Sequence, residues 1–303
     1  MPVNNRLKIL RVNPLMTEEE CDLLKGKPLT ANDCKTLIDY NVDLYDLETG
    51  IVLAKFRKRV IPGHVQVQAY ENLLSAAKTT DSRATAAGDV DNEGKSSRIR
   101  VKKDGTASKQ TISKELVNSG VVGYYDRSAR FPYCRLTAFT HHQFKKFVNA
   151  YGIIKIVDDL YKKLMPKPYA LQRAIADNSS KDFIIPGTAF STVTVNRNYE
   201  TAVHKDSGDF KKGFGNLVAM RKGNFSGCYL TLVKWGVGFD LQNGDVLLMD
   251  VHQWHGNTPM VKHDKDAIRL SLIMYYRENI KNCGTLEQEV NAAKTRKRGT
   301  KLM

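Results

Sequence analysis

Two residues with metal-binding side chains, His204 and Asp206, lie one residue apart in the stretch "AVHKDSGDF". In a strand, residues i and i+2 point to the same side, so an H-x-D pair can hold one metal from one strand end. With a second histidine, the set offers two imidazoles and one carboxylate and leaves coordination positions free, as Fe(II) that activates O2 requires. An H-x-D pair also occurs by chance, and the alternative is that His204 is a structural histidine.

The stretch "VHQWHGNTPM" supplies the second histidine and offers two candidates, His252 and His255. Residues three apart lie on opposite faces of a strand, so only one of the two can face a metal held by the H-x-D pair.

An arginine and a serine follow in "AIRLSLIMYY", where Arg269 and Ser271 share one face of a predicted strand. The planar guanidinium of an arginine beyond the last metal ligand is a two-pronged donor for the far carboxylate of 2-oxoglutarate. Ser271 can donate to the same carboxylate. The ordered set H-x-D, His, Arg-x-Ser therefore favours metal ligation over a structural histidine, and it predicts Fe(II), 2-oxoglutarate and O2 as cofactor and cosubstrates.

The charge of the chain indicates its partner. Among 303 residues, 47 are Lys or Arg and 32 are Asp or Glu, which gives a net charge of +15. So large an excess points to a polyanion, and nucleic acid is the first candidate. The alternative is a generally basic protein with no such partner.

The cysteine pattern predicts reduced thiols in an intracellular protein, because the five cysteines are odd in number and form no C-x-x-C pair. They are Cys21, Cys34, Cys134, Cys228 and Cys283. The start "MPVNNRLKIL" lacks the apolar core of a signal peptide, and no run is long enough to span a bilayer. We expect a soluble monomer, in the cytoplasm of a bacterial or phage-infected host or in the nucleus of a eukaryote.

Residues 1–74 are expected to form an α/β extension packed on the core. "TEEECDLL" and "TANDCKTLIDY" each place a capping Thr before a helix-like stretch, and "GIVLAKFRKRVIP" predicts a strand ended by Pro62. Residues 75–112 are rich in small and polar side chains, which predicts a flexible insertion, because little apolar surface offsets the chain entropy. Its basic stretch "KSSRIRVKKDG" is either a solvated linker or a segment that orders on phosphates.

Residues 113–282 are expected to form the main domain. "HHQFKKFVNAYGIIKIVDDLYKKL" has helical spacing, as does "YALQRAIAD". From about residue 183 the pattern changes to short strands separated by Gly and Asn: "FIIP", "FSTVTVN", "NLVAMRKG", "GCYLTLVKWG", "VGFDLQNGDVLLMD" and "IRLSLIMYYRE". This order predicts an α+β fold with a double-stranded β-helix core of the jelly-roll or cupin type and an N-terminal layer of helices and strands. The basic tail 283–303 is expected to be disordered and either to contact DNA phosphates or to aid solubility.

Several of these stretches resemble the TET/JBP family of Fe(II)/2-oxoglutarate dioxygenases. They are "TVTVNRNYETAVHKDSGDFKKGFGNL", "NGDVLLMD", "WHGNTP", "RLSLIMYY" and, upstream, "CRLTAFT". The similarity is greatest to the thymine dioxygenase domain of the J-binding proteins and covers roughly residues 121–278. It implies a DNA-associated enzyme without the separate base-J-binding domain.

The resemblance implies His204 and Asp206 as iron ligands and Arg269, with Ser271, as the anchor of 2-oxoglutarate. The family's distal histidine precedes an H-x-x-T-P-like stretch, so "HGNTP" selects His255. For Asn196, a contact with the cosubstrate and a purely structural hydrogen bond are both open.

A base pocket is also implied. The residue five after the first histidine reads the Watson–Crick edge of the flipped base, and here it is Asp209. A carboxylate only accepts, which suits thymine N3–H and equally the amino group of 5-methylcytosine. Tyr275 matches the family's stacking aromatic, although a core tyrosine is the alternative, and Trp254 and Phe214 are further stacking candidates.

The implied function is hydroxylation of the C5-methyl group of thymine, 5-methylcytosine or both in DNA, with 2-oxoglutarate decarboxylated to succinate. Since that methyl lies in the major groove, the target nucleotide must flip out of the duplex. Two other hypotheses are an oxygenase of the same fold that acts on N-alkylated nucleic acid or protein, and a non-catalytic DNA-binding module.

Overall fold

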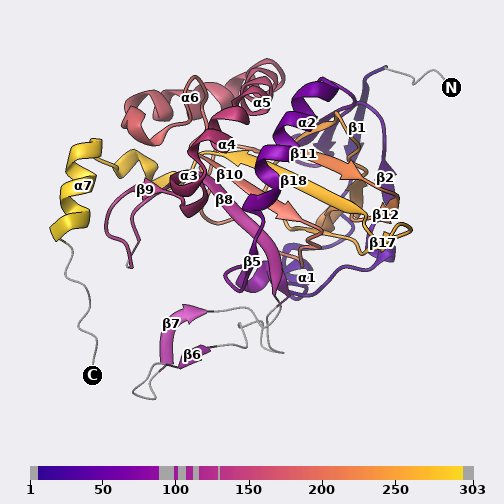
Figure 1. The fold of residues 1–303 in the computed structure, drawn as a ribbon. Helices are drawn as coiled ribbons and strands as arrows, with labels where there is room; N and C mark the ends of the chain where they lie inside the picture. The colour runs from indigo at the N-terminus through magenta and orange to yellow at the C-terminus, as the bar shows by residue number, and fades with distance from the viewer. Residues whose placement is uncertain (1–5, 89–98, 102–106, 112–115, 129, 296–303) are drawn as a thin grey trace.

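Two β-sheets face each other in the computed structural model, which describes residues 6–88, 99–101, 107–111, 116–128 and 130–295 (Figure 1). The larger sheet has the order β1 (Lys8–Val12), β3 (Val42–Asp46), β4 (Val52–Arg57), β15 (Val246–Met249), β11 (Gly215–Lys222), β18 (Ile268–Tyr275), β10 (Thr192–Arg197), β8 (Val117–Tyr125) and β5 (Thr79–Thr80), and β9 (Arg135–Leu136) pairs with β8. The smaller sheet has the order β16 (His255–Asn257), β13 (Leu230–Leu232), β14 (Val237–Phe239) and β2 (Thr36–Ile38). Strands β12 (Phe225–Gly227) and β17 (Met260–Lys262) form a separate pair. The predicted α+β class is confirmed, and the facing sheets are those of a double-stranded β-helix.

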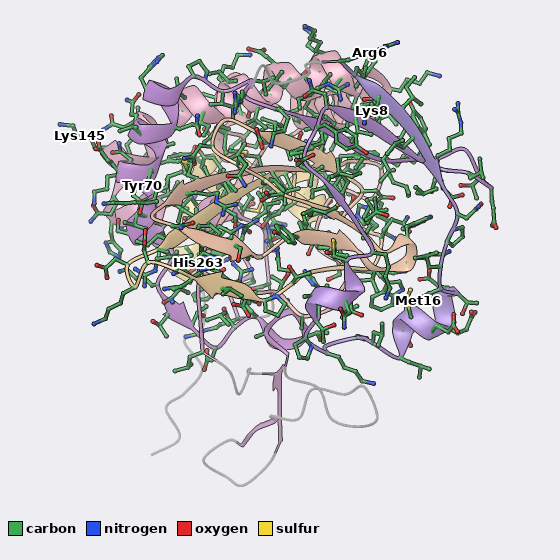
Figure 2. All side chains as sticks on the ribbon, turned by 90° about the vertical axis from the view of Figure 1, so that its right-hand side faces the viewer. Arg6, Lys8, Met16, Tyr70, Lys145 and His263 are labelled. Atoms are coloured by element: carbon green, nitrogen blue, oxygen red, sulfur yellow. A yellow bond between two sulfur atoms is a disulfide. The ribbon has the colours of Figure 1, made fainter. Side chains whose placement is uncertain are left out.

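Helices cover the outer face of the larger sheet, where α5 and α6 lie at the top of Figure 1. The α-helices are α1 (Glu18–Asp22), α2 (Gly63–Leu73), α3 (Ala138–His142), α4 (Phe144–Asn149), α5 (Tyr151–Leu164), α6 (Pro166–Asn178) and α7 (Leu286–Thr295). The 3-10 helices are η1 (Ala31–Asp33), η2 (Leu74–Ala76), η3 (Ala84–Ala87), η4 (Lys181–Phe183), η5 (Val233–Trp235) and η6 (Glu278–Asn282). Figure 2 shows Lys145 of α4 pointing outward from this helical side. In the described part of the chain, no helix has both the length and the apolarity needed to cross a membrane.

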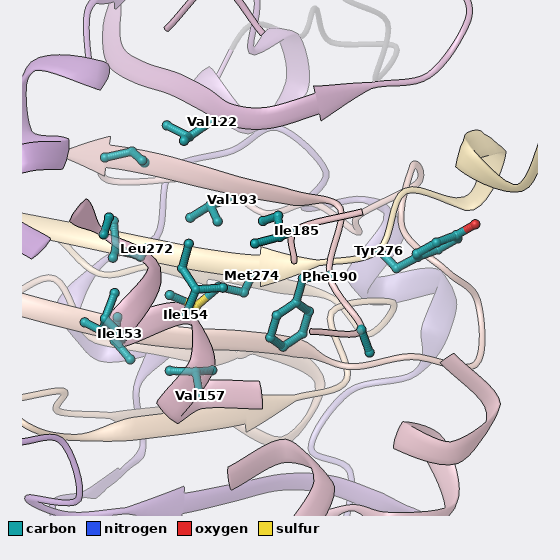
Figure 3. Close-up of a cluster of buried hydrophobic side chains, with 14 of the residues drawn as sticks. Val122, Ile153, Ile154, Val157, Ile185, Phe190, Val193, Leu272, Met274 and Tyr276 are labelled. Atoms are coloured by element: carbon teal, nitrogen blue, oxygen red, sulfur yellow. The ribbon is translucent and has the colours of Figure 1, made fainter. Parts of the chain in front are cut away.

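Strand β18 separates the core from the cavity by simple alternation. Leu272 and Met274 are fully buried and pack with Ile154 and Val157 of α5 (Figure 3). Each such side chain contributes about 1.5–3 kcal/mol to stability by its burial. The residues between them therefore face the opposite side of the sheet, which is the side of the smaller sheet.

Most of the predicted elements form. Thr17 caps α1 in a capping box with Glu20, and the strands predicted from 192 onward form within their stretches. Strand β4 also forms in its predicted stretch, but it ends at Arg57 and not at Pro62. Two predictions are wrong. "TANDCKTLIDY" has only the short η1 and then enters β2, because pairing with β14 extends its second half. "FIIP" is no strand: Phe183 ends η4, and the side chains that follow fill the helical core instead.

The first part of the predicted flexible insertion is folded, which corrects the expectation for residues 75–88. Ala76 and Ala77 are buried, β5 pairs with β8, and η3 follows. Small side chains can pack closely, and sheet pairing satisfies the backbone, so a composition poor in apolar residues does not prevent folding here. Further on, β6 (Ile99–Val101) and β7 (Ala107–Thr111) pair as an antiparallel hairpin. The remaining part of this prediction, 89–98, 102–106 and 112, lies outside the described residues.

The C-terminal region also differs from the prediction. Cys134 and Cys283 form a disulfide across 149 residues, so these two are not reduced thiols, whereas Cys21, Cys34 and Cys228 are free. The odd number of cysteines did not predict this disulfide, because the chain contains three free cysteines besides the bonded pair. Residues 286–295 of the expected disordered tail form α7, whose Glu289 is 2% exposed. The rest of that tail, 296–303, lies outside the described residues.

Candidate active site

A cavity of about 650 Å³ lies between the two sheets, and all eight residues predicted for metal, cosubstrate and base line it. These residues are His204, Asp206, His255, Arg269, Ser271, Asn196, Asp209 and Tyr275. The volume is within the range of about 300–1,000 Å³ that is usual for small-molecule sites.

Strand pairing brings the three candidate metal ligands together. His204 and His255 form an isolated antiparallel bridge, so two residues 51 apart in the chain lie side by side. Their ring centroids are 4.3 Å apart, and His204 Nε2 lies 3.4 Å from Asp206 Oδ1. One potential ligand atom from each of the three residues lies within 4.8 Å of the other two.

The hydrogen bonds of both rings fit a metal site. His204 Nδ1 lies 2.8 Å from the carbonyl oxygen of Ala202, and His255 Nδ1 lies 2.9 Å from that of Gln253. A carbonyl oxygen only accepts, so Nδ1 carries the proton in each ring. Each Nε2 is then left as the metal-binding nitrogen, in the orientation that backbone partners give to metal-ligating histidines.

The electrostatics agree with this donor set. Burial, and then the neighbouring His204, lower the pKa of His255 to about 4, so its imidazole is neutral at pH 7. Burial favours the neutral form of Asp206, but the hydrogen bond with His204 and the positive charges nearby outweigh it and hold its pKa at about 2. His255 and Asp206 thus have the protonation states that metal ligation needs. Burial lowers the pKa of His204, but the contact with Asp206 outweighs this and raises it, so a metal would displace the proton from His204 Nε2.

His252 lies outside this cluster. Its Nδ1 is 3.1 Å from Asp250 Oδ1, and its side chain does not line the cavity. The alternation argument does not apply to it, because His252 lies in the turn before β16 and not in a strand. The motif "HGNTP" selected the same histidine that the geometry brings to His204 and Asp206.

The opposite wall carries the residues predicted for 2-oxoglutarate. Asn196 of β10 is paired in register with Ser271 of β18, and Arg269 lies two residues before Ser271 on the same face. Arg269 is only 6% exposed, yet in the described part of the chain its guanidinium has neither a hydrogen bond nor an acidic partner. A buried arginine without a partner is costly unless an anion pairs with it.

A second arginine reaches this wall from the segment predicted to be flexible. Arg83 lines the cavity, and its Nε donates to Ser119 Oγ at 2.8 Å. Ser119 Oγ in turn donates to Asn196 Oδ1. The prediction missed both residues, and the sequence around Arg83 contains no signal that could have found it.

The base-side residues lie at the other end of the cavity. Asp209 forms an isolated antiparallel bridge with Arg277, which also lines the cavity and was not predicted. Arg277 Nε donates to Asp126 Oδ1 at 2.8 Å, so Asp126 holds the guanidinium from outside. Burial and the nearby Asp206 raise the pKa of Asp209 well above its ordinary value, while Arg277 opposes the shift. Tyr275 is 7% exposed, and its hydroxyl lies 3.3 Å from Thr194 Oγ1.

The two lower-ranked aromatic candidates differ. Trp254 lines the cavity, but its Nε1 donates to Glu18 at 2.7 Å and Lys205 lies over its ring. These two contacts hold the indole in the cavity wall. Phe214 does not line the cavity and packs against the helical core.

Comparisons with known proteins show the family of the chain. Residues 120–278 match the Tet_JBP family, described as the oxygenase domain of the 2OGFeDO superfamily. The chain is 34% identical over 210 residues to the bifunctional helicase and thymine dioxygenase JBP2 of Trypanosoma brucei brucei, a match that covers 66% of this chain and 19% of that protein. It is 30% identical over 290 residues to thymine dioxygenase JBP1-A of Trypanosoma cruzi, a match that covers 91% of this chain and 31% of that protein. The matches thus span only 19% and 31% of the length of these two relatives.

Among solved structures, NgTET1 in complex with 5mC DNA superposes with a TM-score of 0.57 over 96% of this chain and 90% of that one. The sequence identity is 12%, so this likeness supports the fold alone.

Proposed function

The chain belongs to the Tet_JBP family of oxygenase domains in the 2OGFeDO superfamily, and from this membership we propose that it hydroxylates the C5-methyl group of a pyrimidine in DNA, with thymine the favoured base. The observation that carries the proposal is one cavity with three separate sets of groups. These are a His-His-Asp cluster, a buried arginine that has no side-chain partner among the described residues, and an aspartate and an arginine on neighbouring segments.

In this proposal His204, Asp206 and His255 hold Fe(II), and Arg269 holds 2-oxoglutarate. When bound, the metal and the keto acid together supply O2 activation. One oxygen atom enters the methyl group, and 2-oxoglutarate leaves as succinate and CO2. The protein places the methyl group beside the metal site and excludes water from it.

The cosubstrate is bound on the wall formed by β10 and β18. The Arg269 guanidinium offers a two-pronged contact to the far carboxylate, and Ser271 donates to the same group. Ser119 occupies Oδ1 of Asn196, so the Nδ2 amide of Asn196 remains available to the cosubstrate. Arg83 holds this arrangement through Ser119 and adds a second positive charge for a dianion.

The base is read by Asp209 and Arg277. Thymine presents O4, N3–H and O2 along its Watson–Crick edge, so an acceptor opposite N3–H needs a donor opposite a neighbouring carbonyl. The backbones of Asp209 and Arg277 pair and both residues line the cavity, so its wall offers an acceptor and a donor from neighbouring segments. The pair also fits 5-methylcytosine if Asp209 accepts from the amino group and Arg277 donates to N3. Thymine is favoured because both JBP relatives are named thymine dioxygenases.

DNA binding follows from charge and access. The net charge of +15 provides a sequence-independent attraction to phosphates. A metal between two sheets cannot reach a methyl group inside a duplex, so the nucleotide must be extruded into the cavity. Lys25 and Lys205 line the same cavity and add positive charge that attracts the phosphates of the extruded nucleotide.

The test is mass spectrometry of nucleosides from duplexes that contain thymine only, 5-methylcytosine or N-methylated bases, each incubated with the protein, Fe(II) and 2-oxoglutarate. We expect a 5-hydroxymethyl product that depends on both additions and is absent for an Asp206→Ala variant. Demethylation of the N-methylated duplex alone would contradict the proposal.

A further inference from the structure

The loop between β8 and β9 interleaves arginines with aromatic residues. We call the described residues of this connection, 126–128 and 130–134, together with Arg135 at the start of β9, the arginine–aromatic loop. The Arg135 guanidinium lies 4.1 Å from the Phe131 ring centroid, and Arg130 lies over the same ring at 5.2 Å. Phe131 and Tyr133 contact each other edge to face, with centroids 6.0 Å apart. Both rings are partly exposed, and the described hydrophobic clusters include neither.

The loop is held in place from its C-terminal side. Cys134 is disulfide-bonded to Cys283, and its backbone N–H donates to Glu289 at 2.7 Å. Arg127 forms an ion pair with the same carboxylate, which is buried. A disulfide and an ion pair to a buried carboxylate anchor the loop, although its two aromatic rings lie outside the hydrophobic clusters, so the packing of those rings does not explain the anchoring.

The loop begins at the base-reading end of the cavity. Asp126, its first residue, binds Arg277 of the cavity wall. The Tyr125 ring lies between the loop and that wall, with Arg277 at 5.3 Å and Arg135 at 4.9 Å from its centroid. The Tyr125 ring therefore links the loop to Arg277 of the cavity wall.

We propose that the arginine–aromatic loop binds duplex DNA beside the extruded nucleotide, an inference that rests on the proposed function. Aromatic rings stack on any exposed base face, and a partly exposed arginine pairs with phosphate. Tyr133 stacks on a base exposed by the gap that extrusion leaves, and Arg130 contacts the adjacent phosphate. The disulfide and the contacts of Glu289 hold the loop before DNA binds, so less conformational entropy is lost on binding.

Equilibrium binding of the full chain to a thymine-containing duplex, without iron or 2-oxoglutarate, tests the loop separately from catalysis. Tyr133→Ala should raise Kd by about tenfold, the effect of one lost stacking contact. Arg130→Gln should lower the slope of log Kd against log salt by about 0.9, the value for one phosphate contact. A 2-aminopurine next to the target thymine should show less unstacking with Tyr133→Ala than with the unchanged protein.

Two matched variants on the helical side provide the controls. Phe144→Ala removes an aromatic ring that is 53% exposed on α4, and Lys163→Gln removes an exposed charge from α5. Thermal unfolding of all four variants checks that they are folded. The proposal is overturned if Tyr133→Ala binds as Phe144→Ala does, or if Arg130→Gln and Lys163→Gln have the same salt slope. Failure of the proposed function would give a different result, namely intact binding without a hydroxymethyl product.

Discussion

His204 and His255 exchange two backbone hydrogen bonds, with N···O distances of 2.9 and 3.0 Å in the two directions. This reciprocal pair fixes the separation of the two imidazoles through the backbone, before any metal binds. The ligand cluster is therefore preorganised by the contact between His204 and the first residue of β16.

The first prediction distinguishes the two neighbouring histidines. His255→Ala removes one of three proposed ligands and should reduce Fe(II) binding and succinate formation to background. His252→Ala should preserve both, because His252 pairs with Asp250 away from the cavity. Fe(II) titration and a succinate assay measure the difference. Loss of iron in the His252 variant alone would show that the wrong distal ligand was chosen.

The second prediction concerns the buried arginine. Arg269→Lys keeps a positive charge but loses the two-pronged geometry, so the KM for 2-oxoglutarate should rise by about ten- to a hundredfold with iron affinity nearly unchanged. Arg221→Lys is the control, because Arg221 is paired in register with Arg269 but binds Asp240 outside the cavity. Equal KM values for the two variants would remove Arg269 from the cosubstrate site.

A third prediction concerns pH and the C-terminal helix. The Glu289 side chain is buried, which favours its neutral form, but the hydrogen bonds from Arg127, Gly284 and Cys134 outweigh this and lower its pKa. A pKa that is lower in the folded state stabilises the fold above the unfolded value, near 4.5, and this contribution is lost as pH falls through the folded pKa. Glu289→Gln should therefore be less stable than the unchanged protein at pH 7, and this difference should shrink as pH falls below about 4.5. Denaturant unfolding of the two proteins at pH 7 and below about pH 4.5 measures the difference in stability. A difference that does not change with pH would assign another role to Glu289.

Local periodicity explains which parts of the site could be predicted. Arg269, Ser271 and Tyr275 lie on one face because a strand alternates every two residues, and this pattern is visible in the sequence alone. Arg83 reaches Ser119 across 36 residues, and Ser119 reaches Asn196 across 77. Such contacts depend on which strands pair, so neither composition nor spacing signals them. The pairing of Cys134 with Cys283 escaped prediction for the same reason.

The last prediction concerns the choice of base. In its ionised form, which Arg277 favours, Asp209 only accepts, whereas the amide that Asp209→Asn introduces at this position also donates. Thymine N3–H then loses its charged acceptor, whereas N3 of 5-methylcytosine gains a donor. An unmet hydrogen bond at this edge costs about 1–3 kcal/mol, so selectivity should move towards 5-methylcytosine by about ten- to a hundredfold.

Competition between thymine and 5-methylcytosine duplexes measures this ratio in both proteins, with Asp159→Asn on the exposed face of α5 as the control. Arg277→Gln should also weaken turnover of thymine, because O4 then loses its cationic donor, and succinate formation without DNA should be unaffected. If Asp209→Asn leaves the ratio unchanged while Arg277→Gln alters it, Asp209 does not read the base. Selectivity would then depend on the guanidinium that Asp126 holds in the cavity wall.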